Sequence, residues 1–400
     1  MEQNLRIPGP TSLPPQVAQA ISQPMINHRS PEFTAIMQRV TGHLQYFFQT
    51  EQAVLGFPTA GSGAMEAAIV NCFSAGDEVL VVSIGVFGKR FAKIASIFGV
   101  QVHHLEIPWG QAADPAVVQE FLSDLPRVRG VFLTHNETST GVMNDLAALV
   151  RAIRERRQDV LIVVDAISSL GCVDLRMDEW DLDVVLTASQ KGWMAPPGLA
   201  MIGVSQRAWA AYERATLPRF YWDFRTTMTW LQKGQTPWTP PVNVYFGLDV
   251  ALQMMHDEGR AAIFQRYQTL ADFVRSQVQL LGLRLFADVQ HASNTVTALH
   301  VPAGIEAKNL LKALRDQENV VIAGGQEHLD GHVIRIGHLG YVRIEEIVDC
   351  FAALQRQLVA QGYHLPSIGM PQEHILPDMY PVASIQGPRP GAEIYKSSQS

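Results

Sequence analysis

Lys191 is the residue of this chain best placed to do covalent chemistry. It lies in the segment Leu186 to Gly198, LTASQKGWMAPPG, after an apolar run that predicts a buried strand. A lysine at the end of such a strand would face a cleft. A cleft can lower the pKa of an ammonium, so that the neutral amine is available to form an imine with a carbonyl compound. A lone lysine is more often a solvated surface residue, so the interpretation depends on its neighbours.

Asp165 ends another apolar run, in the segment VVDAISSLG. Because parallel sheets bind their ligands at the C-terminal ends of the strands, this carboxylate would face the same cleft as Lys191. The run Val184 to Ala188 supplies one strand between the two residues. An anionic carboxylate in that place can pair with a protonated pyridine nitrogen of a cofactor. The alternative role for Asp165 is the cap of a helix.

Two further segments are rich in groups that could hold anionic oxygens. In PTAGSGAMEAA, glycines precede a helix that we expect to begin near Ala64, and the N–H groups of a helix start can bind a phosphate. A simple turn explains those glycines equally well. The segment THNETSTGV follows the predicted strand Gly130 to Thr134, and its hydroxyl and amide groups can donate to a phenolate or a phosphate.

Arg335 is a cation within the apolar strand sequence VIRIGHLG. An unpaired guanidinium is costly to bury, so Arg335 requires an anionic partner. Its two parallel donors suit the α-carboxylate of an amino acid. A structural salt bridge is the alternative.

The elements that would position these residues follow an α/β pattern. From Gly61 to about Ser205, β-rich runs alternate with segments of helical periodicity, such as Gly88 to Phe98 and Leu146 to Arg156. This alternation predicts a mostly parallel sheet with helices on both faces. The six predicted strands are Glu78 to Ser83, Val100 to Ile107, Gly130 to Thr134, Leu161 to Asp165, Val184 to Ala188 and Leu199 to Val204.

The rest of the chain predicts a small α+β domain after the proline-rich stretch Thr236 to Val242. We expect a large domain over residues 21–245, a small domain over 246–363 and a poorly ordered tail over 364–400, where Pro, Gly, Ser and Gln replace periodic sequence. The small domain's elements are predicted as helices at Val244 to His256, Ala261 to Leu281, Ala307 to Arg315 and Ile344 to Gln357, and strands at Thr295 to Val301, Val320 to Ala323 and Val333 to Ile336.

Composition excludes several classes of partner. The 400 residues carry a formal net charge of -7, so no basic surface is expected for nucleic acid or an anionic membrane. The longest apolar runs are too short to span a bilayer, which favours a cytoplasmic protein. Cys72, Cys172 and Cys350 show no metal-ligand spacing, so no metal site is expected and all three are predicted to pack in the core.

Taken in order, the motifs resemble the class V aminotransferases of fold type I, specifically the alanine–glyoxylate, serine–glyoxylate and serine–pyruvate group. The resemblance runs from Ile7 to about Tyr363. It implies pyridoxal 5'-phosphate as cofactor and transfer of an amino group from alanine or serine to glyoxylate or pyruvate in a ping-pong cycle. The motifs are IPGPTSLP, NHR, AGSGAMEAA, GVFGKR, HNETSTGV, VVDAISSLGC, ASQKGWMAPPG, TPWTPPV and VIRIGHLG.

The resemblance also implies roles for individual residues. Lys191 would carry the cofactor as a Schiff base and act as general acid and base, and Asp165 would pair with the pyridine nitrogen. Residues 1–20 would contribute to the active site and to a homodimer with shared sites. The remaining implied roles are Phe87 stacked on the ring, Thr138 near the ring hydroxyl, Gln190 beside the lysine, Ala60, Gly61 and Ser62 on the phosphate, Thr236 and Thr239 reaching the phosphate of the neighbouring subunit, and Arg335 and Gly9 on the substrate.

Some positions depart from the family pattern, and two other functions stay open. Phe87 stands where relatives have tryptophan, and Thr236 where some have tyrosine. The alternatives are a pyridoxal-phosphate lyase of the same fold, such as a desulfurase with a mobile cysteine, and a non-catalytic subunit of a larger complex. The segment Arg219 to Trp230, RFYWDFRTTMTW, could cover the substrate or pack at a dimer interface.

Overall fold

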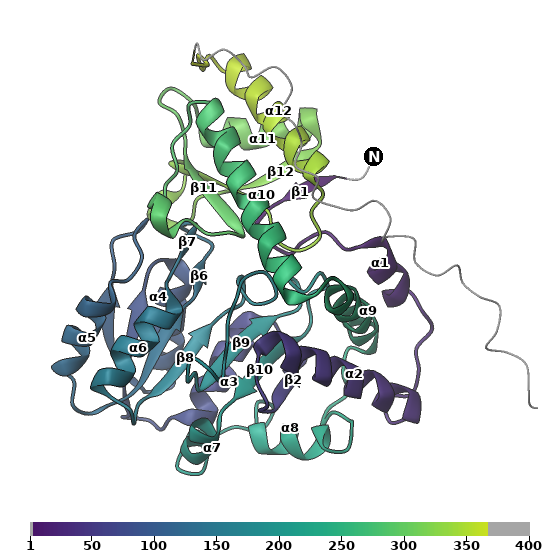
Figure 1. Ribbon diagram of the computed structural model, residues 1–400, viewed down its shortest axis with the longest axis vertical. Helices are drawn as coiled ribbons and strands as arrows, with labels where there is room; N and C mark the ends of the chain where they lie inside the picture. Colours follow the sequence, from purple (N-terminus) through teal and green to yellow (C-terminus); the bar gives the residue numbers. More distant parts are fainter. Residues whose placement is uncertain (1–2, 367–400) are drawn as a thin grey trace, which may run out of the picture. The chain divides into compact units, whose positions relative to one another are not determined.

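A seven-stranded sheet forms the centre of the computed structural model, which describes residues 3–366 (Figure 1). Its strand order is β2-β10-β9-β8-β5-β3-β4. The five strands from β9 to β4 are parallel, whereas β10 is antiparallel to both of its neighbours. The strands are β2 (Val54–Phe57), β10 (Ala200–Val204), β9 (Val184–Ala188), β8 (Leu161–Asp165), β5 (Val128–Thr134), β3 (Glu78–Ser83) and β4 (Gln101–Glu106).

Helices cover both faces of this sheet because alternate strand residues point to opposite sides. In β3, Val79 and Val81 belong to a core shared with α3, α4, α7 and α8, whereas Leu80 and Val82 belong to a core shared with α1, α2, α5, α6 and α9. The helices are α1 (Pro15–Ile21), α2 (Pro31–Phe48), α3 (Gly61–Cys72), α4 (Val86–Ile97), α5 (Pro115–Ser123), α6 (Leu146–Arg156), α7 (Gln206–Tyr212), α8 (Phe224–Leu231) and α9 (Val242–Glu258).

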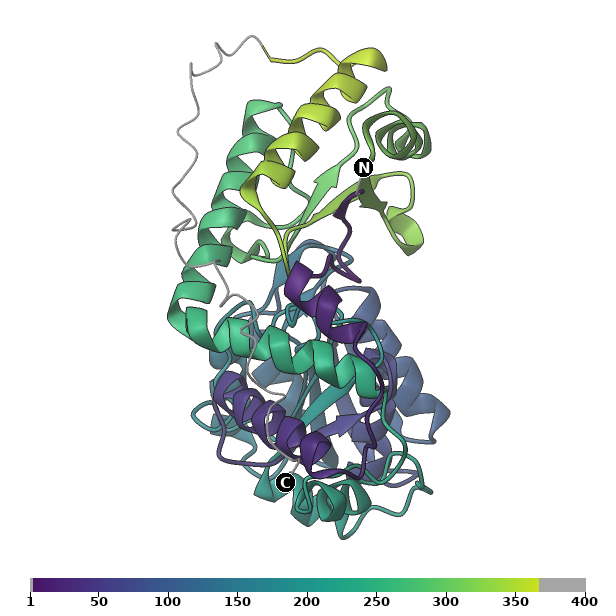
Figure 2. The same cartoon turned by 90° about the vertical axis from the view of Figure 1, so that its right-hand side faces the viewer.

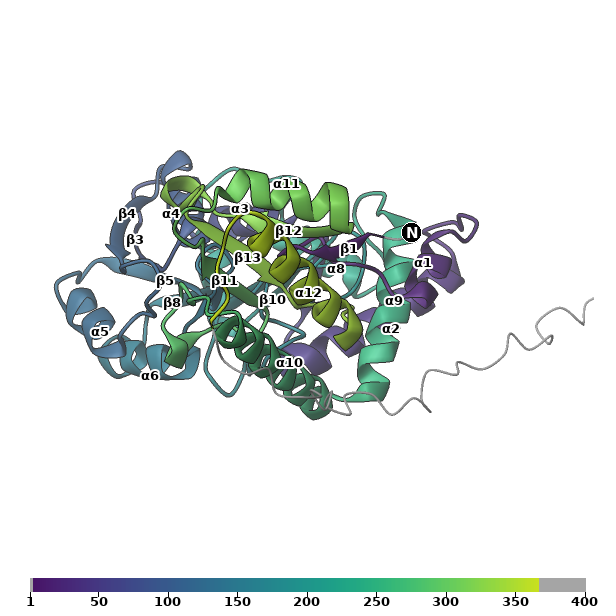
Figure 3. The ribbon, with the colours of Figure 1, turned by 90° about the horizontal axis from the view of Figure 1, so that it is seen from above.

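A second sheet has the order β1-β12-β13-β11 and joins the beginning of the chain to its later part. Strand β1 (Asn4–Arg6) runs parallel to β12 (Val320–Gly324), and β13 (Val333–Gly337) pairs antiparallel with β12 and β11 (Val296–His300). Figure 2 shows purple β1 beside these later strands. Helices α10 (Arg260–Leu280), α11 (Ala307–Glu318) and α12 (Ile344–Ala360) accompany this sheet, as Figure 3 shows from above.

Four short elements complete the fold. The hairpin of β6 (Asn136–Glu137) and β7 (Val142–Met143) follows β5, and two 3-10 turns, η1 (Val289–His291) and η2 (Glu327–Leu329), flank the second sheet.

The predicted elements are confirmed within a few residues at their ends. The sequence interpretation missed the 18-residue helix α2 and the short strands β1 and β2, which have three and four residues. It also named no range for α1, α5, α7, α8, β6 or β7. The helix expected near Ala64 begins at Gly61, because Ala60 already has the extended backbone of a cap. All three cysteines are free and buried, as predicted.

The described residues fall into one compact unit, so the division into domains at 245 and 246 stays a prediction. The tail predicted over 364–400 lies outside the described residues from 367 onward. Within residues 3–366, no helix has the length and apolarity needed to cross a bilayer. The cytoplasmic location stays a prediction.

Candidate active site

Asp165 and Lys191 meet at the C-terminal edge of two adjacent parallel strands. Asp165 is the last residue of β8 and pairs in register with Leu186 of β9. Lys191 lies in the turn after β9. This turn is stabilised by the hydroxyl of Ser189, which donates to the carbonyl of Pro196 at 2.5 Å. The sequence therefore brings the two predicted residues to one edge of the sheet, as expected.

Burial shifts the pKa values of these two groups in opposite directions. It raises the pKa of Asp165 to about 7, with the charge of Glu137 adding to the rise, while the N–H of Ile167 and the charge of Lys191 oppose it. Burial lowers the pKa of Lys191 to about 8, and the charge of Arg335 adds to the fall while that of Asp165 opposes it. An amine with this pKa is partly neutral near neutral pH. A cation placed beside the buried Asp165 carboxyl would stabilise its charged form.

The N-terminal segment lies directly on Lys191. The ammonium donates to the carbonyl oxygen of Pro8 at 2.5 Å, and Thr11 bonds back to the main chain of Gln190 and Lys191. Gly9 has a φ of 125°, a backbone conformation that favours glycine, and a Cβ atom there would lie 2.7 Å from Nζ of Lys191. The amide oxygen of Gln190 is buried without a hydrogen-bond partner among the described residues.

The first turn of α3 forms a cradle for an anion. The N–H groups of Gly61 and Ser62 have no carbonyl within their own helix to bond, and Ala60 caps the helix without a side-chain bond. The Nη1 atom of Arg90 lies 3.4 Å from the hydroxyl oxygen of Ser62. A Cβ at Gly61 would collide with Ile167, which follows Asp165, so this glycine lets the cradle approach the end of β8. Arg90 was missed in the sequence.

Phe87 and Thr138 are tied together by Glu137, a residue that sequence reasoning missed. One oxygen of the buried Glu137 carboxylate accepts from the N–H of Phe87 at 2.9 Å, and the other accepts from the Ser139 hydroxyl at 2.7 Å. Burial raises the pKa of Glu137, and these hydrogen bonds oppose the rise. The guanidinium carbon of Arg90 lies 4.6 Å from the centre of the half-buried Phe87 ring. The sequence signal that could have pointed to Glu137 is an acidic residue inside the polar segment HNETSTGV.

Arg335 has no carboxylate partner within residues 3–366, so the structural salt bridge considered from sequence is absent from this part of the chain. Its Nε donates to the carbonyl of Gly324 at 2.8 Å, and its Nη1 donates to the carbonyl of Thr138 and to Oε1 of Gln326, both at 3.0 Å. Arg335 is 7% exposed, and burial lowers its pKa to about 10. The guanidinium is thus fixed near Lys191 with its charge uncompensated by contact. Gln326 was also missed.

Thr236 and Thr239 are not joined to this cluster by any hydrogen bond between described residues. The buried Thr236 donates to the carbonyl of Trp238 at 2.8 Å and accepts from Arg29 through its own carbonyl at 2.6 Å. Thr239 is exposed.

The chain was compared with known proteins. The family model described as aminotransferase class-V matches residues 4–347. A protein of a Synechococcus species named soluble hydrogenase, small subunit, is 44% identical over 90% of this chain and 94% of its own length. L-aspartate–glyoxylate aminotransferase of Paracoccus denitrificans is 38% identical over 84% and 85%.

Among solved structures, alanine–glyoxylate aminotransferase from a Nostoc species matches with a TM-score of 0.86 and 30% identity, over 90% of this chain and 96% of that one. The parallel sheet with helices on both faces is therefore the fold of type I aminotransferases, as the sequence predicted. Because the family model spans most of its length, the chain belongs to the class V aminotransferases and is a transaminase that depends on pyridoxal phosphate.

Proposed function

We propose that this transaminase moves the amino group of a small amino acid, alanine or serine, to a small 2-oxo acid, glyoxylate or pyruvate, in two half-reactions. The observation that carries the proposal is the pair of buried groups with opposed pKa shifts, Asp165 and Lys191, at one strand edge beside Arg335. The names of the Paracoccus and Nostoc relatives both include glyoxylate, which supports this acceptor.

The residues at this edge fit the cofactor. We assign Ala60, Gly61 and Ser62 to its phosphate, because the free N–H groups of a helix start lie there and Nη1 of Arg90 is 3.4 Å from the Ser62 hydroxyl oxygen. Phe87 would stack on the ring, with Thr138 near the ring hydroxyl. The unpartnered oxygen of Gln190 supports a polar group of the cofactor beside Lys191.

Lys191 and Asp165 divide the chemistry between them. Pyridoxal phosphate, when bound, supplies the carbonyl that accepts the amino group and the conjugated ring that takes up electrons from the α-carbon. Asp165 would hold a proton on the ring nitrogen, since a cation beside this buried carboxyl restores its charge. Lys191 would act as the base that removes the substrate's α-proton and returns it, because its lowered pKa leaves a neutral amine near pH 8.

Arg335 and Gly9 would recognise the substrate. Arg335 lies close enough to Lys191 for its charge to lower the lysine's pKa, and no anion of the described chain touches it. An α-carboxylate would supply that anion. The backbone of Gly9 lies so close to Lys191 that a Cβ there would be 2.7 Å from Nζ, and this close approach on one side of the amine favours small substrates.

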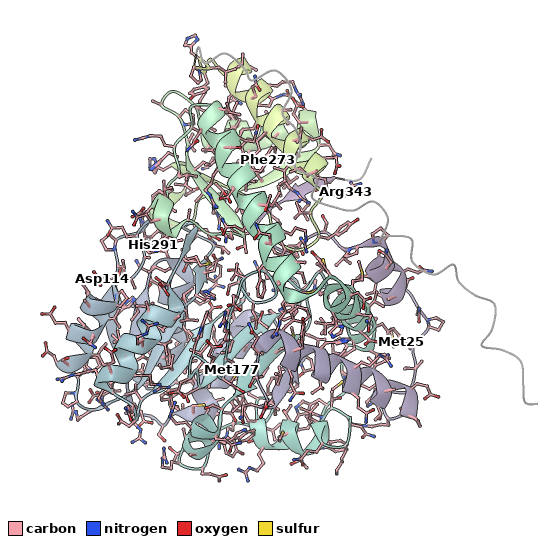
Figure 4. All side chains as sticks on the ribbon, in the orientation of Figure 1. Met25, Asp114, Met177, Phe273, His291 and Arg343 are labelled. Atoms are coloured by element: carbon pink, nitrogen blue, oxygen red, sulfur yellow. The ribbon has the colours of Figure 1, made fainter. Side chains whose placement is uncertain are left out.

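We also propose a homodimer in which Thr236 and Thr239 reach the phosphate of the partner. Thr239 is exposed, and the neighbouring segment Arg219 to Trp230 carries Phe220, which is 75% exposed. Met25, labelled in Figure 4 on the outside of the molecule, is 64% exposed. Large apolar side chains on a surface favour an interface between subunits.

The two rival functions gain no support from the described residues. A desulfurase needs a reactive cysteine, but burial raises the pKa of Cys72 and Cys350 to about 12 and that of Cys172 to about 11. A non-catalytic subunit is suggested by the name of the Synechococcus relative. A scaffold alone would have no need of Lys191 and Asp165 buried together, since each ionises at a cost.

Donor and acceptor assays test the proposal directly. The purified protein, loaded with pyridoxal phosphate, should show the visible absorbance of a lysine-bound cofactor at about 420 nm. Alanine, serine and aspartate would each be paired with glyoxylate, pyruvate and 2-oxoglutarate, and kcat/KM compared. Alanine or serine with glyoxylate or pyruvate should give the highest values. Faster reaction of aspartate or 2-oxoglutarate would reject the small-substrate assignment.

A further inference from the structure

We propose that the side-chain amide of Gln326 occupies the place of the substrate carboxylate on Arg335 and that substrates bind by displacing it. The strength of the Gln326–Arg335 hydrogen bond then determines how tightly a carboxylate must bind Arg335 to displace the amide. The inference rests on the role proposed above for Arg335 as the carboxylate-binding residue.

The hydrogen bonds of Arg335 leave little room for a carboxylate. A guanidinium binds a carboxylate through two adjacent N–H groups, either Nη1 with Nη2 or Nε with Nη2. Nε is bonded to the carbonyl of Gly324 at 2.8 Å, and Nη1 is shared by Thr138 and Gln326, each at 3.0 Å. Within residues 3–366, Nη2 alone has no such bond. A two-bond contact therefore requires at least one present partner to leave.

Gln326 is the partner that can leave most easily. The carbonyl of Gly324 is held in β12, where Gly324 pairs with Ile334 of β13. The carbonyl of Thr138 lies between Glu137 and Ser139, which are bonded to each other through the buried carboxylate. Gln326 contacts Arg335 through a side chain with three rotatable bonds, so it can withdraw without moving the backbone.

The backbone that carries Gln326 is itself anchored. A Cβ at Gly325 would lie 1.9 Å from the carbonyl oxygen of Leu329, which leaves no slack in this turn. The carboxylate of Glu327 lies 3.9 Å from the ammonium of Lys89 on α4, and the ring of His328 lies 4.1 Å from that of Trp109. These contacts fix the backbone of Gln326 so that its side-chain amide can reach the guanidinium of Arg335.

A neutral amide on a guanidinium discriminates among ligands by charge. The amide oxygen carries only a partial negative charge. A carboxylate carries a full charge, so it forms the stronger hydrogen bond with Arg335 and displaces the amide. A neutral polar ligand gains nothing over the amide already present. The exchange also costs part of the carboxylate's binding energy, because the Gln326 bond must be broken first.

Two substitutions of Gln326 test this exchange in opposite directions. Gln326→Met keeps the size of the side chain but removes the acceptor, and Gln326→Glu supplies a carboxylate that cannot diffuse away. The probe is propionate, measured by calorimetry with the cofactor-loaded protein and as a competitive inhibitor of alanine. We expect about three- to tenfold tighter propionate binding in Gln326→Met and at least about tenfold weaker binding in Gln326→Glu.

Controls separate this role from a structural one. Gln290→Met, on the exposed turn η1, should leave propionate binding unchanged. Ethylamine, which lacks a carboxylate, should react equally with all variants. Gln326→Met should lower KM for alanine and leave kcat within about twofold, since the exchange affects binding and not the chemical step.

A parallel variant, Arg335→Lys, distinguishes failure of this inference from failure of the proposed function. Lysine keeps the charge but cannot make two parallel bonds. If Arg335→Lys binds propionate as the unmodified protein does, then Arg335 does not bind the carboxylate and both proposals fall. If Arg335→Lys loses propionate binding while Gln326→Met leaves it unchanged or weaker, only the displacement of Gln326 is wrong.

Discussion

The carboxylate of Glu137 accepts a hydrogen bond from the backbone N–H of Phe87 at 2.9 Å, and this contact fixes the first turn of α4 against the hairpin that carries Thr138. Phe87 is the residue proposed to stack on the cofactor ring. By holding the backbone of Phe87, Glu137 would position the cofactor ring without touching it. The same hairpin holds Arg335 through the carbonyl of Thr138.

Glu137→Gln should therefore alter the cofactor's surroundings. An amide offers one oxygen where the carboxylate offers two, so either Phe87 or Ser139 loses its acceptor, at a cost of about 1.5–3 kcal/mol for a bond to a charged group. We expect weaker cofactor binding and a changed visible circular dichroism band. Unchanged cofactor affinity and an unchanged band would show that Glu137 does not position Phe87. Glu120→Gln, at the exposed surface of α5, is the matched control for folding.

The stability of the cofactor-free protein should fall between about pH 4 and pH 7 because of Asp165. Its pKa is raised from 3.8 to about 7, so the folded state binds more protons than the unfolded state in that range. The stability that this group contributes is present below pH 4 and lost as the pH rises through 7, by about 4 kcal/mol. In Asp165→Asn this loss should disappear.

The measurement is the free energy of unfolding of both cofactor-free proteins in urea at pH 5 and pH 8. The free energy of unfolding of Asp165→Asn, relative to that of the unmodified protein, should be higher at pH 8 than at pH 5. If the difference between the two proteins is the same at both pH values, Asp165 has a normal pKa.

Asp165→Asn should keep the cofactor but lose turnover. The cradle at Gly61 and Ser62 is untouched, whereas a neutral amide cannot stabilise a protonated ring nitrogen. We expect the rate of α-proton removal to fall by at least about 100-fold, the scale of a catalytic proton transfer. Deuterium exchange at the α-carbon of alanine measures that rate. Near-normal exchange would contradict the role of Asp165.

The protein should be an obligate homodimer that loses cofactor on dissociation, because Thr236 and Thr239 are proposed to complete the partner's phosphate site. Thr239→Ala should weaken cofactor binding without changing the mass of the assembly. Sedimentation at decreasing concentration, with absorbance of the bound cofactor recorded together, measures both. A cofactor-loaded, active monomer would contradict the shared site.

The sequence predicted the elements that carry strong periodicity and the residues that stand at their ends. Strands β8 and β9 are largely apolar runs, so the sequence alone places Asp165 and Lys191 at one sheet edge. Short strands such as β1 have too few residues for a pattern, and the place of β1 depends on pairing with residues more than 300 positions away, as for Asn4 with Val320.

Residues that act through other residues were beyond the reach of sequence patterns. Gln326 lies in a loop and Glu137 in the two-residue strand β6, and the contacts that make them important form only when the fold brings Arg335 and Phe87 to them. Arg335 itself was predicted correctly as a buried cation, but its partners are two main-chain carbonyls and an amide, not an acid.

The central claim is that Lys191 carries the cofactor, and borohydride reduction followed by peptide mapping tests it most directly. Reduction makes the bond between an amine and a carbonyl cofactor permanent, so the labelled lysine can be identified by mass spectrometry. The account predicts a label on the peptide containing Lys191, and loss of that label and of nearly all transamination in Lys191→Ala. A label on another lysine, such as Lys89 beside Phe87, or retained activity in Lys191→Ala, would contradict it.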